Sequence, residues 1–70
     1  MLTDQAIEVA KRLAHGEVFF AHREPRLSPI IRDQFRAVGL EITSDGRDDV
    51  RFFAHDLAEF RRSLAKIPNK

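Results

Sequence analysis

The 70-residue sequence contains no cysteine, no tryptophan and no tyrosine. Without cysteine, the chain can form neither disulfide bonds nor a thiolate zinc site. Six phenylalanines supply all of its aromatic carbocycles. A chain of this length forms at most one small domain, whose core leaves only a modest net stability. We therefore expect residues 1–70 to form a single domain, with residues 68–70 as a frayed tail.

Long apolar runs are missing as well. No uninterrupted apolar stretch approaches the roughly 20 residues that a membrane-spanning helix needs. The start of the chain also lacks the basic and then apolar pattern of a secretory leader. These absences predict a soluble cytoplasmic protein that has no membrane partner.

An excess of one charge is absent too, because 12 Lys and Arg residues stand against 11 Asp and Glu residues, for a formal net charge of +1. The bulk charge therefore indicates no class of partner. The distribution is uneven: residues 21–40 and 57–70 are basic, whereas residues 41–56 are acidic. This pattern predicts a dipolar domain with basic helices and an acidic hairpin.

The clearest local signals lie between residues 28 and 53. Ser28 is a suitable N-cap, and Pro29 then occupies the first helical position, where its missing N–H costs nothing. Gly39 ends this central helix, because glycine readily adopts the left-handed conformation of a helix stop. Arg32 and Arg36 lie one turn apart on a side of the helix away from its apolar stripe.

A hairpin is predicted to follow the central helix. Residues 40–42 alternate apolar and polar side chains, which is typical of a half-buried strand. Asp45-Gly46 is a strong reversal signal, and residues 50–53 form the returning strand.

The flanking segments supply the remaining elements. Thr3 can cap a helix over residues 4–15, and the apolar run 18–21 indicates a short buried strand. Residues 22–27 are polar and contain a proline, so they are predicted to form an extended connector. Asp56 can cap a final helix whose apolar stripe includes Phe60, which we expect to be buried beside an exposed Arg61.

The expected order is helix, strand, helix, strand, strand, helix. The first two strands and the helix between them could form a right-handed parallel crossover. We therefore predict an α+β domain with a small mixed or antiparallel sheet packed by helices.

No residue pattern indicates catalysis. The three histidines have no ligand spacing, and the acidic residues near Gly46 lack the ligand order of a calcium loop. Each serine lies where a cap, a turn or an exposed helix position explains it, and no nucleophile elbow or phosphate-binding glycine loop is present. We expect no metal, no cofactor and no enzymatic activity.

Two functions remain. One is a small regulatory or adaptor protein of bacterial or phage type that binds another protein. Adjacent rings on a strand point to opposite faces, so a sheet covered on one side only would leave rings for a partner or for a homodimer. The predicted partner-binding residues are Phe19, Phe20, Phe52 and Phe53.

The alternative is a winged-helix-like regulator that binds nucleic acid through the basic segment 22–36, since arginine grips phosphate and reads guanine. Two features weigh against it: no helix immediately precedes the central one, and the hairpin tip is acidic. The predicted contacts to nucleic acid or to an acidic partner are Arg23, Arg26, Arg32 and Arg36.

Overall fold

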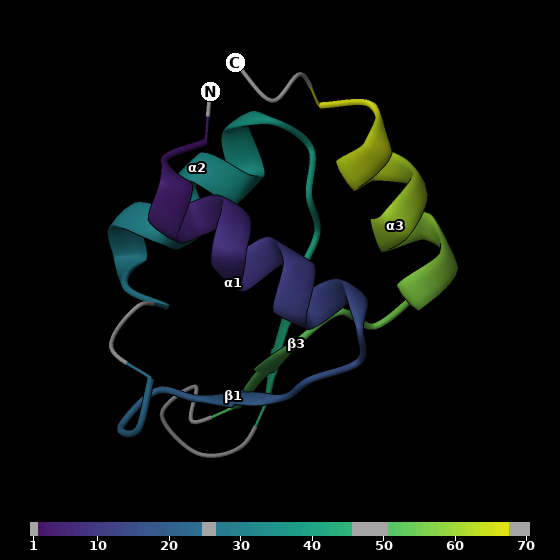
Figure 1. The fold of residues 1–70 in the computed structure, drawn as a ribbon. Helices are drawn as coiled ribbons and strands as arrows, with labels where there is room; N and C mark the ends of the chain where they lie inside the picture. The colour runs from purple at the N-terminus through teal and green to yellow at the C-terminus, as the bar shows by residue number, and fades with distance from the viewer. Residues whose placement is uncertain (1, 25–26, 46–50, 68–70) are drawn as a thin grey trace.

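The computed structural model describes residues 2–24, 27–45 and 51–67. Its elements are α1 (Asp4–Ala14), β1 (Phe19–Phe20), α2 (Pro29–Ala37), β2 (Thr43–Asp45), β3 (Arg51–Phe53) and α3 (Leu57–Ala65). This order confirms the predicted α+β class. The three helices lie to one side of the small sheet (Figure 1). The predicted tail at residues 68–70 lies outside the described residues.

The helices begin at the predicted caps. The Thr3 hydroxyl accepts a hydrogen bond from the Ala6 N–H at 3.2 Å, which satisfies a donor that the first turn of α1 leaves unpaired. Ser28 and Asp56 accept equivalent bonds at the starts of α2 and α3. After α2, Gly39 has a φ of +83°, in the left-handed region that favours glycine. Local sequence therefore sets these helix ends.

The sheet is antiparallel throughout, with strand order β1-β3-β2. Of the two sheet types predicted, the antiparallel one is correct. The first and second strands run in the same direction, but they are not neighbours, because β3 lies between them. Phe52 of β3 is the Cα partner of both Phe19 and Ser44. The central strand β3 thus carries a buried ring, Phe52, that is paired on both sides.

The second strand begins later than predicted. Residues 40–42 are not part of a strand, and β2 starts at Thr43. The Leu40 N–H instead donates to the Phe35 carbonyl at 2.9 Å and so helps to end α2, while the Leu40 side chain is buried. Leu40 and Ile42 therefore alternate with polar residues because their side chains pack on the core, and not because this segment pairs with another strand.

The first strand is shorter than the predicted range 18–21. Val18 is 44% exposed, and the Phe20 carbonyl accepts hydrogen bonds from the N–H groups of Arg23 and Glu24 at 2.9 and 2.8 Å. These bonds turn the chain directly after Phe20, so the described start of the connector is a turn and not an extended segment. Leu27, which was assigned to the polar connector, is buried.

One hydrophobic core joins the helices to the inner face of the sheet. Its largest fully buried side chains are Val9, Leu13, Phe19 and Phe35. The start of α1 is also tied to α2, because the Thr3 N–H donates to the Gln34 side chain at 2.9 Å.

The last helix packs through the predicted stripe. Phe60 is buried, and Leu57 and Leu64 are partly buried against the core. Arg61 is exposed, as predicted, but its side chain also contacts another helix. Its Nε donates to the Ala14 carbonyl at 2.6 Å, so it links α3 to the C-terminal end of α1.

We predict that Phe60→Ala leaves the protein largely unfolded at 37 °C. Losing a buried phenylalanine side chain costs about 3–5 kcal/mol, against a total stability of roughly 5–15 kcal/mol for native proteins. Thermal melts followed by circular dichroism measure the effect. Arg62→Ala is the matched control, because Arg62 is exposed on the same helix. A Phe60→Ala melting temperature within a degree or two of wild type would show that α3 does not contribute to the core in this way.

Candidate functional site

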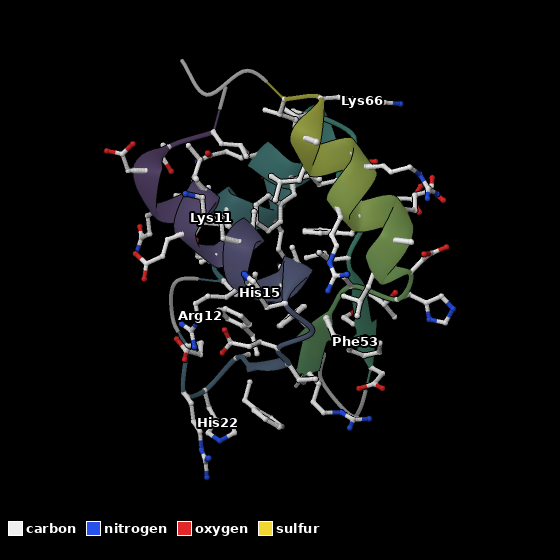
Figure 2. The ribbon with its side chains drawn as sticks, turned by 45° about the vertical axis from the view of Figure 1, so that its right-hand side comes forward. Lys11, Arg12, His15, His22, Phe53 and Lys66 are labelled. Atoms are coloured by element: carbon white, nitrogen blue, oxygen red, sulfur yellow. The ribbon has the colours of Figure 1, made fainter. Side chains whose placement is uncertain are left out.

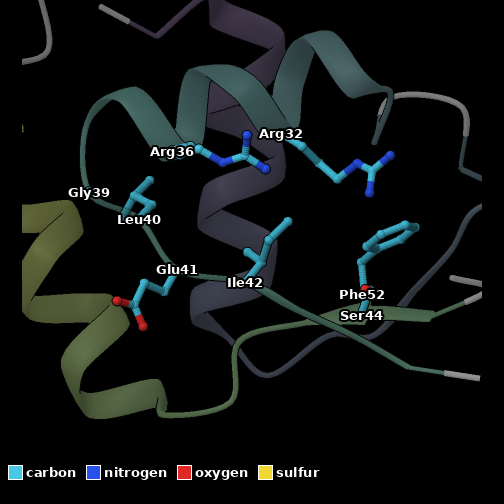
Figure 3. Close-up of a pocket in the computed structure, with 8 residues that line it drawn as sticks. All are labelled: Arg32, Arg36, Gly39, Leu40, Glu41, Ile42, Ser44 and Phe52. Carbon is cyan, nitrogen blue, oxygen red and sulfur yellow. The ribbon is translucent and has the colours of Figure 1, made fainter.

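A pocket of about 470 Å³ lies between α2 and the segment that leads into β2. Figure 3 shows two arginine side chains reaching from α2 into this space, with Phe52 below one of them. We call it the arginine pocket. Its lining residues are Arg32, Arg36, Gly39, Leu40, Glu41, Ile42, Ser44 and Phe52.

The helical repeat positions the two arginines. Arg32 and Arg36 are four residues apart, so their side chains leave α2 on the same side, one turn apart. Ile31 and Phe35 occupy a neighbouring stripe, about 100° around the helix, and are buried in the core. Burial of that stripe fixes the rotation of α2 and directs both guanidinium groups into the pocket.

Arg32 is held against an aromatic ring. Its guanidinium carbon lies 4.7 Å from the centroid of the Phe52 ring, within the range of a cation–π contact. The Nε atom of Arg32 is buried and has no hydrogen-bond partner among the residues that the structure describes. A buried donor without an acceptor is destabilising, because it has lost its water and gained nothing in exchange. Packing on Phe52 therefore fixes the position of the Arg32 side chain but leaves its Nε–H without an acceptor among the described residues.

Arg36 is held much more loosely. Its side chain is 84% exposed, and its contact with Asp33, at 3.9 Å, lies at the surface. Exposed ion pairs of this kind contribute little to stability. The Glu41 carboxylate also lines the pocket but points away from both guanidinium groups (Figure 3). Arg36 can therefore be redirected toward a bound anion at low cost.

Apart from Arg32, Arg36 and Phe52, the lining residues were not predicted from the sequence as part of a site. Leu40 and Ile42 provide apolar surface from the segment between α2 and β2, and Ser44 adds a hydroxyl from β2. The alternation over residues 40–42 was a real signal of partial burial, but it was assigned to a strand. The four-residue spacing of Arg32 and Arg36 was the one sequence signal that pointed to this side of α2.

The four predicted partner-binding rings divide between the two faces of the sheet. Phe19 and Phe52 are buried beneath the helices, with exposed fractions of 1% and 2%. Phe20 and Phe53 are half-buried and belong to the opposite face, since side chains alternate along a strand. Of the four rings, only Phe20 and Phe53 are accessible to a partner, on the face of the sheet away from the helices.

Of the other two predicted arginines, only Arg23 belongs to the described residues. Arg23 is exposed in the turn after β1 and does not line it, whereas Arg26 lies outside the described residues. The structure thus brings two of the four predicted arginines together with one of the four predicted rings.

Among the described residues, no group of three or more His, Cys, Asp or Glu side chains is placed to hold a metal ion. His15 and His22 lie well apart (Figure 2). Within the same residues, no helix has both the length and the apolar character needed to cross a membrane.

Comparison with known proteins gives no relative: no protein-family model, no curated protein and no solved structure matches the chain. The chemistry of the arginine pocket is therefore the basis for assigning a function. Two cations above an apolar floor can hold an anionic group that carries an apolar neighbour.

We predict that Arg32→Met does not destabilise the fold. The substitution loses a cation–π contact worth about 0.5–2 kcal/mol and removes an unsatisfied donor that costs about 1–3 kcal/mol, while the methionine still covers Phe52. Thermal melts should give a melting temperature equal to or above that of wild type, and Arg36→Met is the exposed control. A fall of more than about 4–8 °C, the effect of 1 kcal/mol in a domain of this size, would mean that Arg32 serves the fold.

Proposed function

We propose that the protein is a small non-enzymatic regulatory or adaptor protein that acts by binding another protein through the arginine pocket. The observation that supports this most is the pairing of Arg32 and Arg36, one turn apart, over an apolar floor in a pocket of about 470 Å³. Binding sites of proteins combine apolar lining with a few converging polar groups in this way.

Two further features favour protein binding. Arg32 stacks on Phe52, and arginine and aromatic side chains are enriched at the centres of protein interfaces. Phe20 and Phe53, on the helix-free face of the sheet, add aromatic surface for a second contact. Self-association of two copies through that face stays a prediction.

The proposal is tested by panning a random peptide library displayed on phage against the immobilised protein. Ser44→Trp places a large ring in the mouth of the arginine pocket, because Ser44 lines it and is exposed. Thr43→Trp is the matched control. Thr43 is next to it on β2, faces the opposite side and lines a smaller pocket of about 120 Å³.

We expect selected peptides to bind the wild type and Thr43→Trp equally, and to lose binding to Ser44→Trp. Blocking the pocket removes the surface that they contact, whereas Thr43→Trp leaves it open. Fluorescence anisotropy of the labelled peptides measures the affinities. A library that yields no binder, or peptides that bind Ser44→Trp as tightly as wild type, would contradict the proposal.

A further inference from the structure

Two arginines lie over phenylalanine rings on the inner face of the sheet. The guanidinium carbon of Arg12 is 4.6 Å from the Phe19 centroid, and that of Arg32 is 4.7 Å from the Phe52 centroid. Phe19 and Phe52 are Cα partners across β1 and β3. The molecule therefore contains two similar arginine–phenylalanine stacks on neighbouring strands.

In the first stack, carboxylates satisfy the guanidinium group. Arg12 donates from Nε and from Nη2 to the two carboxylate oxygens of Glu17, both at 2.9 Å. A third bond runs from Nη2 to Glu24 at 3.4 Å. The bidentate bond to Arg12 lowers the pKa of the Glu17 carboxyl below its ordinary value. This stack is complete within the chain.

In the second stack, no carboxylate of the described residues takes the same place. Arg32 forms no ion pair with them, and its buried Nε lacks an acceptor. Asp33 contacts the exposed Arg36, Glu41 points away, and Asp45 is bound by Arg51 at 2.7 Å. A guanidinium has five N–H donors in a planar fork that matches a carboxylate.

We infer that the arginine pocket binds the side-chain carboxylate of an aspartate or glutamate that is flanked by apolar residues in a partner protein. The Arg32 guanidinium turns toward the pocket to expose its buried Nε–H, and the carboxylate then takes the position that Glu17 occupies toward Arg12. Arg36 supplies a second cation, and the flanking apolar side chain packs on Leu40 and Ile42. This inference depends on the proposed function and adds the identity of the recognised side chain.

The surroundings favour one carboxylate over a polyanion. A nucleic acid backbone presents a phosphate at every nucleotide and needs a continuous basic strip. The pocket has two cations, its lining includes the carboxylate of Glu41, and the Asp33 carboxylate lies 3.9 Å from the Arg36 guanidinium. These two carboxylates would repel the further phosphates of a nucleic acid backbone. A single acidic side chain with apolar neighbours brings only one negative charge.

The test compares two synthetic peptides by fluorescence anisotropy. One places a glutamate between two leucines in a neutral sequence rich in serine and glycine, and the other has glutamine in place of the glutamate. The protein variants are Arg32→Met, which keeps the cover over Phe52, and Arg62→Met, which removes one exposed positive charge elsewhere.

We expect the glutamate peptide to bind wild type about ten-fold or more tightly than the glutamine peptide, because hydrogen bonds between charged groups are the stronger kind. Arg32→Met should remove that preference, and Arg62→Met should retain it. Circular dichroism melts of both variants exclude an effect of unfolding.

Equal binding of the two peptides by wild type would overturn this inference. The proposed function would then stand if both peptides still lost binding to Ser44→Trp, and it would fail with the inference if neither bound. Tighter binding of random-sequence duplex or single-stranded DNA, weakened by added salt and abolished in Arg32→Met, would also overturn it. That result would assign the pocket to nucleic acid.

Discussion

Phe19 and Phe52 face each other across β1 and β3, and the placement of the helices depends on the burial of this pair. Burying each ring contributes about 1.5–3 kcal/mol, and pairing across strands adds roughly 0.2–1 kcal/mol. Because the side chains of a strand alternate, burial of these two rings places Phe20 and Phe53 on the opposite face. One pairing register therefore decides which rings form the core and which remain near the surface.

The same pair determines where the arginines lie. α1 brings Arg12 over Phe19, and α2 brings Arg32 over Phe52. The chain completes the first stack with Glu17, which follows α1 directly and is close enough to reach Arg12. The second stack borders a pocket instead of an acidic turn. The contrast between a satisfied and an unsatisfied guanidinium is the basis for assigning a binding role to Arg32.

Features decided within one helical turn could be predicted from the sequence. The caps at Thr3, Ser28 and Asp56 are examples, because a cap depends only on residues two or three positions away. Features that join distant segments could not be predicted. The bond from Arg61 to Ala14 joins two helices. The arginine pocket is lined by α2, by the segment between α2 and β2, and by β2 and β3. The wrong prediction of a strand at residues 40–42 has the same origin. An alternating pattern indicates which side chains are buried, but not which element they pack against.

The most direct test of the account observes the Arg32 Nε–H itself. In nitrogen-15 NMR spectra of arginine side chains, a buried Nε–H is protected from exchange with water and gives its own signal. Titration with the glutamate peptide should move the Arg32 signal downfield as a carboxylate oxygen becomes its acceptor, while the signal of Arg12, already bound to Glu17, stays in place. A titration that saturates without moving the Arg32 signal would contradict the account, because the peptide would then be held by other groups.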